Sequence, residues 1–455
     1  MPKNRQVHPS ESATPRILVI FGISGDLAKK KLLPALRTIC QADQLPSNLQ
    51  IIGVTRQPLT KTKVMAPLVG LPGGPELAEA FQIFQLDTAV SSEYERLKKY
   101  LATLNENTEA ELLFYLAVPP NIAGVIVEGL GRAGLNEKGA KLLLEKPFGQ
   151  DLASAKQFIG ELHRHFDEDQ VYRIDHYLAK EMVQNILLFR ASNSVFRHVW
   201  HNQAIESIEI MASEKIGIEG RAVFYEQTGA LRDILQSHLF QLMALVLMEL
   251  PTELSWQNIH SARLQALQQI QPIPIDQLTK RVKRAQYQGY TRDVGNLDSS
   301  TETFVSVRLF SNDPNWQDVP ITLTTGKNLA EKYTEIRVNF RALPSSQANR
   351  LVFRIQPHEG TEIDIWAKQP GYERHLKPVK LAFAYETQFA ERLPEAYEQV
   401  LLDSLRSDKS LFAGADEILV SWQLLQPILD AWQNDQKNLT TYPAGTTAES
   451  LSVTD

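Results

Sequence analysis

The sequence predicts an α/β plus α+β protein with two domains. The N-terminal domain is expected to hold a doubly wound parallel sheet, and the C-terminal domain a large, mainly antiparallel sheet with helices. Near-continuous apolar runs alternate with helical patterns in the first third, as expected for parallel strands covered on both faces. Beyond about residue 176, strand-like segments follow one another with few helices between them, which indicates antiparallel pairing.

Five short apolar runs of the first third are predicted to form the parallel sheet. They cover residues 16–21, 50–55, 81–86, 111–118 and 140–145. The clearest helix between them covers residues 91–104, where Tyr94, Leu97 and Leu101 recur at helical spacing. We place this domain at residues 15–175, after a polar segment at residues 1–14 that we expect to be disordered.

The second domain is predicted at residues 176–440, with long helices at residues 180–191 and 228–250. The strand-like segments of this domain are residues 303–309, 321–325, 334–340, 351–355 and 362–366. Two further helices are expected at residues 394–405 and 416–432. The last residues, 441–455, are rich in Thr, Ser and Ala, so we expect a loose tail there.

Composition limits the classes of function. Hydrophobic residues make up 43% and charged residues 22% of the chain, an ordinary globular composition. The net charge of -6 argues against a nucleic-acid partner, and no stretch approaches the roughly 18 apolar residues of a membrane span. Cys40 is the only cysteine, which excludes an intrachain disulfide and fits a reducing compartment. We therefore expect a cytoplasmic protein without a membrane partner.

A glycine-containing turn follows the first predicted strand, in the segment Gly22-Ile23-Ser24-Gly25-Asp26-Leu27-Ala28. Gly22 permits a tight turn, and Gly25 lets the backbone approach a pyrophosphate at the start of a helix. The spacing is G-x-x-G-x-x-A, and an ordinary βα turn with two glycines is the alternative. The segment predicts a Rossmann-type cofactor site at Gly22, Ser24, Gly25, Asp26 and Leu27.

Arg56 follows the second predicted strand, where an acidic residue would favour NAD by binding the ribose hydroxyls. An arginine at this point can pair with a 2′-phosphate instead, so we predict NADP as the cofactor, with NAD as a weaker alternative. A solvated arginine at a strand end is the other interpretation. Tyr115, near the end of the fourth strand, is a further predicted cofactor contact, because ligands bind at strand ends in such sheets.

Two polar segments carry the predicted chemistry. The first is Glu145-Lys146-Pro147-Phe148-Gly149, and the second is Arg173-Ile174-Asp175-His176-Tyr177-Leu178-Ala179-Lys180-Glu181. In the second segment Asp, His, Tyr and Lys fall within six residues, a group that can bind a phosphate and hold a carboxylate for acid–base work. A helix N-terminus with a capping aspartate is the alternative interpretation.

Together these segments resemble glucose-6-phosphate dehydrogenases, which have G-x-x-G-D-L-A, E-K-P-F-G and R-I-D-H-Y-x-x-K-E in this order. The resemblance extends over about residues 16–435. It implies oxidation of D-glucose 6-phosphate to 6-phospho-D-glucono-1,5-lactone with hydride transfer from C1 to NADP+, the first oxidative step of the pentose phosphate pathway. It also implies a homodimer or homotetramer.

The resemblance assigns roles residue by residue. It implies that the sugar phosphate binds His176, Tyr177, Lys180 and Lys332. It implies that the sugar itself binds Glu214, Asp233 and Lys327. Lys146 matches a lysine between substrate and cofactor, and the resemblance favours a cis Lys146–Pro147 bond. His238 matches the general base and Asp175 its orienting carboxylate.

His238 is also considered from the residues alone, because oxidation at C1 needs a base for the hydroxyl proton and imidazole titrates near neutral pH. A core histidine on the predicted helix is the alternative. Asp233 lies five residues earlier, about 140° around an α-helix, and cannot readily orient His238. Asp175 is therefore the expected partner. The nicotinamide carries the redox chemistry, so no metal is expected.

Two other functions stay open from the sequence. One is a related dehydrogenase acting on a different sugar, which would not need the phosphate cluster. The other is a non-catalytic member of the family, which would have no chemical need for both His238 and Asp175. Turnover of free glucose and of glucose 6-phosphate distinguishes these functions.

Overall fold

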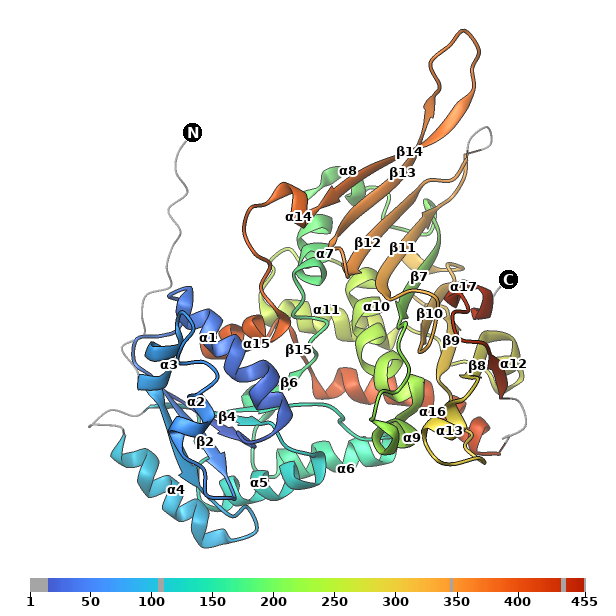
Figure 1. Ribbon diagram of the computed structural model, residues 1–455. Coiled ribbons are helices and arrows are strands. Elements are labelled where there is room, and N and C mark those ends of the chain that lie inside the picture. Colours follow the sequence, from blue (N-terminus) through green and yellow to red (C-terminus); the bar gives the residue numbers. More distant parts are fainter. Residues whose placement is uncertain (1–14, 105–109, 344–346, 435–438, 454–455) are drawn as a thin grey trace, which may run out of the picture. The chain divides into compact units, whose positions relative to one another are not determined.

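The computed structural model describes residues 15–104, 110–343, 347–434 and 439–453 (Figure 1). The expected disordered lead-in at residues 1–14 lies outside the described residues. The chain divides into two compact units rather than two continuous domains. Unit 1 contains residues up to 148, residues 157–174 and residues 395–412, and unit 2 contains the remainder. A late helix of the chain thus returns to the N-terminal unit.

Unit 1 is built on a seven-stranded sheet with the order β15-β6-β5-β4-β1-β2-β3. Its strands are β1 (Arg16–Phe21), β2 (Leu49–Thr55), β3 (Phe81–Gln85), β4 (Glu111–Leu116), β5 (Lys141–Leu144), β6 (Val171–Ile174) and β15 (Phe412–Ala413). The pairs from β6 to β3 are parallel, which confirms the predicted doubly wound sheet. β1 lies between β2 and β4, so its carboxyl end is the point where the strand order reverses.

Helices connect these strands. They are η1 (Ala28–Leu32), α1 (Leu33–Gln41), α2 (Lys61–Met65), α3 (Gly74–Ala80), α4 (Ser91–Thr103), α5 (Pro120–Arg132), α6 (Leu152–His163), η2 (Glu168–Gln170) and α15 (Ala396–Arg406). In α4, Tyr94, Leu97 and Leu101 are buried, which confirms the helical spacing read from the sequence.

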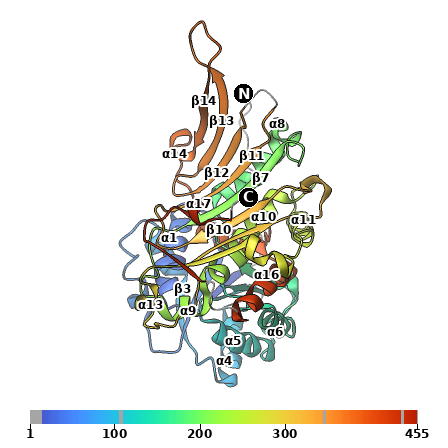
Figure 2. The ribbon, with the colours of Figure 1, turned by 90° about the vertical axis from the view of Figure 1, so that its right-hand side faces the viewer.

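Unit 2 is built on a nine-stranded sheet with the order β14-β13-β12-β11-β7-β10-β9-β8-β16 (Figure 2). Its strands are β7 (Ile205–Ser213), β8 (Val282–Tyr287), β9 (Phe304–Leu309), β10 (Ile321–Gly326), β11 (Tyr333–Phe340), β12 (Arg350–Gln356), β13 (Gly360–Lys368), β14 (Leu376–Ala384) and β16 (Thr440–Tyr442). Six of the pairs are antiparallel, whereas β7 pairs with β10 and β8 with β16 in parallel. The prediction of a mainly antiparallel sheet is confirmed.

The helices of unit 2 include η3, which carries Asp233 and His238, and α7, which begins directly after Lys180. The set is α7 (Glu181–Ser192), α8 (Ser194–Arg197), α9 (Ala222–Ala230), η3 (Leu231–Leu239), α10 (Phe240–Leu247), α11 (Trp256–Gln268), η4 (Ile275–Gln277), α12 (Leu278–Arg281), α13 (Tyr290–Asp293), η5 (Pro314–Trp316), α14 (Tyr385–Gln388), α16 (Ala415–Asn434) and α17 (Ala448–Leu451). No helix of the described residues combines the length and the apolar character needed to cross a bilayer.

The helix expected at residues 228–250 is broken near its start. Gly229 has φ 62° and ψ −177°, which separates α9 from the π-helical segment η3. A Cβ at Gly229 would lie 2.4 Å from Glu302 Oε1, so this close approach requires glycine. The same Glu302 oxygen accepts a hydrogen bond from the Leu231 backbone N–H at 2.9 Å. A buried acid thus caps the N-terminus of η3, where the helix dipole favours negative charge.

The opposite end of this helical segment, in the last turn of α10, is capped by three side chains. The backbone oxygens of Leu245 and Met248 accept from the Arg190 guanidinium at 2.5 and 2.7 Å. The backbone oxygens of Val246 and Leu247 accept from the indole N–H groups of Trp200 at 2.9 Å and Trp316 at 2.8 Å, respectively. These four carbonyls would otherwise lack partners in the helix, and a cation favours the C-terminal end of its dipole.

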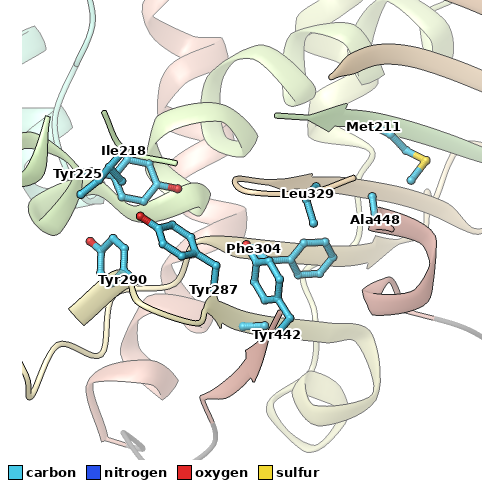
Figure 3. Packing of buried hydrophobic residues seen from close by; sticks show 10 residues of the cluster. Met211, Ile218, Tyr225, Tyr287, Tyr290, Phe304, Leu329, Tyr442 and Ala448 are labelled. Carbon is cyan, nitrogen blue, oxygen red and sulfur yellow. The ribbon is translucent and has the colours of Figure 1, made fainter. Parts of the chain in front are cut away.

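The expectation of a loose tail at residues 441–455 is wrong for the described part of this segment. Thr440–Tyr442 forms β16 beside β8, and Tyr442 is only 1% exposed. Ala448 of α17 and Val453 are also buried. Tyr442 and Ala448 pack into the cluster drawn in Figure 3. The Thr- and Ser-rich composition concealed these widely spaced apolar anchors; residues 454–455 lie outside the described residues.

Candidate active site

A buried carboxylate and imidazole form the centre of the site. Asp175 comes directly after β6, and His238 lies in η3. Asp175 Oδ1 is 2.5 Å from His238 Nδ1 and also accepts from the Tyr177 backbone N–H at 2.9 Å. Asp175 is 3% exposed and His238 is 0% exposed. The structure therefore contains the pair that the sequence predicted, with Nε2 on the ring edge away from the carboxylate.

The helix geometry by which the sequence analysis excluded Asp233 as the partner of His238 is wrong. The 140° separation of Asp233 from His238 assumed an α-helix, but η3 is a π-helix with i→i+5 hydrogen bonds. Residues five apart are then about one turn apart and share a face of the helix. Asp233 is partly buried and lies on the same side as His238, although Asp175 makes the contact with Nδ1.

Two aromatic rings hold the His238 imidazole. The Tyr177 ring stacks on it with centroids 4.2 Å apart and an interplanar angle of 19°. The His176 ring meets it edge-on at 4.4 Å and 71°. With the Asp175 contact, these rings fix the imidazole plane.

A second group of polar side chains surrounds Lys180, the residue before α7. Its Nζ donates to Gln356 Oε1 at 2.6 Å and lies 5.4 Å from the centroid of the Tyr177 ring. Gln356 also donates to Thr334 Oγ1 at 2.9 Å, so its amide is oriented. Burial raises the pKa of the Tyr177 hydroxyl, which keeps that group neutral. Lys180, Tyr177 and His176, which the sequence predicted to bind the sugar phosphate, therefore lie beside the Asp175–His238 pair.

Gln356 is a site residue that the sequence analysis missed. It lines a cavity of about 470 Å³ together with Lys332. It therefore connects Lys332 to Lys180, two predicted phosphate contacts that are far apart in the sequence. The available signal was a polar residue at the end of an apolar run, directly before Pro357.

Glu214 and Lys327 lie together because β7 and β10 pair in parallel, with Ser213 opposite Gly326. The two side chains that follow these positions form a salt bridge between Lys327 Nζ and Glu214 Oε2. The Glu214 side chain is 28% exposed, whereas Lys327 is 2% exposed and lies 5.1 Å from the Tyr225 ring centroid. Glu214 therefore offers the accessible polar atoms of this pair, and the buried Lys327 holds its carboxylate by the salt bridge.

The predicted cofactor turn of unit 1 is a tight turn between β1 and η1. Gly22 has φ +83°, and a Cβ there would lie 2.3 Å from the backbone oxygen of Ala117. Gly25 donates its N–H to Gly22 O at 2.9 Å, and no side chain caps the N-terminus of η1. Ser24 and Asp26 are exposed, with Asp26 bound to Lys30 at 2.8 Å, and Leu27 is half-buried. The turn stands where the strand order reverses, the ligand position in such sheets.

Arg56 follows β2 at the same sheet edge, because β1 and β2 are in register through Phe21 and Val54. The residue is exposed, and its guanidinium has no carboxylate partner among the residues that the structure describes. Its backbone oxygen accepts from the Gln85 side chain at 3.1 Å. The guanidinium is thus available to an anion.

The Tyr115 side chain, which the sequence predicted to contact the cofactor, is buried in the structure. Tyr115 is 0% exposed, and its hydroxyl donates to Glu145 Oε1 at 2.6 Å. Tyr397 also hydrogen-bonds Glu145, and burial raises the pKa of both phenols. The two phenols thus hold Glu145, the residue before Lys146. The Lys146 side chain is half-buried. The Lys146–Pro147 bond is cis, as the resemblance suggested.

Comparisons with known proteins decide the family. Residues 19–185 match the family model for the glucose-6-phosphate dehydrogenase NAD binding domain, and residues 187–452 match the model for its C-terminal domain. This chain belongs to the glucose-6-phosphate dehydrogenase family. Glucose-6-phosphate 1-dehydrogenase of Treponema pallidum (strain Nichols) is 36% identical, covering 97% of this chain and 93% of that protein.

Solved glucose-6-phosphate dehydrogenases also have this fold. One, in complex with its substrate glucose-6-phosphate, has a TM-score of 0.89 at 30% identity, covering 95% of both chains. Another, from Mycobacterium avium, has a TM-score of 0.82 at 30% identity and the same coverage. Members of the glucose-6-phosphate dehydrogenase family are oxidoreductases acting on a CH–OH group, and their NAD-binding domain calls for a nicotinamide cofactor.

Proposed function

We propose that this chain is a glucose-6-phosphate 1-dehydrogenase that oxidises D-glucose 6-phosphate to 6-phospho-D-glucono-1,5-lactone with NADP+. The observation that carries the proposal is the buried Asp175–His238 pair beside the Lys180 cluster, in a chain of this family. The reaction breaks the C1–H bond and the O–H bond of the C1 hydroxyl. The hydroxyl loses a proton to a base, the carbon loses a hydride, and a C=O bond forms.

His238 is the proposed base, accepting the C1 hydroxyl proton at Nε2. Asp175 holds the hydrogen on Nδ1 and stabilises the imidazolium that forms, which the 2.5 Å contact supports. The stacked Tyr177 ring limits rotation of the imidazole. When bound, the nicotinamide supplies the hydride acceptor. Burial of the pair strengthens its electrostatic interaction relative to water.

The sugar phosphate is proposed to bind His176, Tyr177, Lys180 and Lys332. Two ammonium groups and an imidazole suit a dianion, and Gln356 is oriented to contribute its amide. Phosphate binding is remote from C1, but its binding energy orients the reacting carbon. Glu214 and Asp233 are proposed to accept from sugar hydroxyls, with Lys327 holding Glu214 in place. Lys146 keeps its proposed role as a contact to substrate and cofactor.

The cofactor is proposed to bind the turn at Gly22, Ser24, Gly25, Asp26 and Leu27. Arg56 is proposed to pair with the 2′-phosphate, which favours NADP over NAD. Its exposed guanidinium, without a carboxylate partner among the described residues, supports this assignment. The tight turn needs glycine at position 22, where a Cβ would lie 2.3 Å from the backbone oxygen of Ala117. The N-terminus of η1, which no side chain caps, supports the pyrophosphate position.

A homodimer or homotetramer in the cytoplasm is proposed for the assembly and location. β14 forms one edge of the unit 2 sheet and exposes Leu376, Val379 and Leu381. An edge strand with exposed apolar side chains favours association with another chain. The free thiol of Cys40 is consistent with a reducing compartment.

The test of the proposed function is the absorbance band of the reduced nicotinamide, followed with each combination of two sugars and two cofactors. Glucose 6-phosphate with NADP+ should give the highest kcat/KM, and free glucose should be turned over poorly. Equal turnover of both sugars would favour a dehydrogenase of a different sugar. Absence of turnover in a protein that binds glucose 6-phosphate would favour a non-catalytic family member.

A further inference from the structure

We propose that the C-terminal segment of residues 440–446 positions the loop of residues 327–332, with Tyr442 as the principal positioning residue. The inference rests on the proposed function, because this loop carries Lys327 and Lys332. In this inference Tyr442 affects substrate binding through the position of the loop and does not contact the substrate.

The loop leaves β10 in a conformation that its own residues do not enforce. Lys327 donates its backbone N–H to Thr303 O at 2.9 Å, and Leu329 donates to Glu214 O at 3.0 Å. Asn328 between them has φ 57°, in the left-handed region that a non-glycine residue adopts at a cost. A conformation of this kind persists where neighbouring groups hold it.

The C-terminal segment supplies bonds on the other side of the loop. The Tyr442 hydroxyl donates to Lys327 O at 2.6 Å, and it is 2.9 Å from Thr303 Oγ1. Gly445 donates its N–H to Asn328 O at 3.0 Å, and Ala330 donates to Thr446 O at 3.0 Å. Three hydrogen bonds thus join the C-terminal segment to the loop at Lys327, Asn328 and Ala330.

Burial makes these bonds consequential. Tyr442 is 1% exposed, Leu329 is 1% exposed, and both lie in one apolar cluster (Figure 3). Removal of the Tyr442 hydroxyl would leave the Lys327 carbonyl without that donor in a place with little access for water. Relaxation of that carbonyl would tilt the backbone from which the Lys327 side chain reaches Glu214.

The test is Tyr442→Phe, with Tyr290→Phe as a matched control. Tyr290 is a buried phenol of the same cluster, but its hydroxyl donates to Glu226 Oε2 at 2.8 Å, away from the loop. Both variants should lower Tm. Only Tyr442→Phe should raise the KM for glucose 6-phosphate, by about three- to ten-fold, while the KM for NADP+ stays unchanged.

An unchanged KM for glucose 6-phosphate in folded Tyr442→Phe, or an equal increase in Tyr290→Phe, would overturn the inference. Absence of turnover in the wild type would refute the proposed function instead, and amide hydrogen exchange then still tests the contact. In the wild type the amides of Ala330 and Gly445 should exchange with the same free energy of opening, because each is bonded across the loop and the C-terminal segment. Exchange of the Gly445 amide from an open tail while Ala330 stays protected would also overturn it.

Discussion

Replacement of Asp175 by asparagine separates the charge of this carboxylate from its hydrogen bond. One oxygen, Oδ1, accepts from His238 Nδ1 at 2.5 Å and from the Tyr177 backbone N–H at 2.9 Å. A backbone N–H can only donate, so it should orient the asparagine with its oxygen on that side and its NH₂ group away. His238 then keeps its hydrogen on Nδ1, and Nε2 can still accept a proton.

The expected loss in Asp175→Asn is therefore the loss of charge alone. A hydrogen bond to a charged group contributes about 1.5–3 kcal/mol, and a neutral one about 0.5–1.5 kcal/mol. The difference of about 1–2 kcal/mol corresponds to a decrease of roughly 5- to 30-fold in kcat. His238→Asn removes the base itself, so kcat should fall by about 10²–10⁴-fold.

Steady-state kinetics on the two variants and their double mutant, with a substrate-binding titration, measure these effects. The double mutant should be little worse than His238→Asn, because residues acting as one unit are not additive. A loss above 10³-fold in Asp175→Asn would show that the amide turns its NH₂ group to His238 and imposes the wrong tautomer. Near-normal kcat in folded His238→Asn would return that residue to a structural role.

Three further changes test the cofactor, the phosphate and the packing of unit 1. Arg56→Ala should raise the KM for NADP+ about 10- to 100-fold and that for NAD+ far less; an equal effect on both would mean that Arg56 does not read the 2′-phosphate. Lys180→Ala should weaken binding of glucose 6-phosphate strongly and turnover of free glucose little, and equal effects would mark Lys180 as structural. Burial raises the pKa of Asp403 from 3.8 to about 7, so its contribution to stability is full below pH 3.8 and is lost as the pH rises through 7. Asp403→Asn should therefore raise the free energy of unfolding by about 1–2 kcal/mol at pH 8 and by less at pH 5, measured by urea denaturation; the same increase at both pH values would contradict this.

The strands that the sequence predicted are those with continuous apolar character. β1, β2 and β3 begin and end within about one residue of the predicted bounds. For β1 and β2 the reason is that both faces of a central parallel strand are buried. β14 was missed, since Pro378 and two lysines obscure its pattern. Proline is tolerated there because β14 is an edge strand. The short strand β6 was missed as well, although the site segment follows it directly.

Residue types in the site could be predicted, but their directions could not. Asp175 and His238 are 63 residues apart, and their contact was expected from the resemblance and from the chemistry of a base. The burial of Tyr115 depends on which face of β4 it occupies, and continuous apolar strands carry no alternation to reveal that face. Gln356 was missed for the same reason, because its role depends on its contact with Lys180 across the fold.

The π-helix η3 is the part of the candidate site least accessible to sequence reasoning. An α-helix through this segment would direct Asp233 and His238 to different sides. With i→i+5 bonding both point to one side, as their proposed roles of sugar contact and base require. Buried Glu302 caps the first residue of the segment, and Arg190 caps the last turn of α10. The change from π-helical to α-helical bonding occurs at Phe240, between these two capped ends of the continuous helical segment.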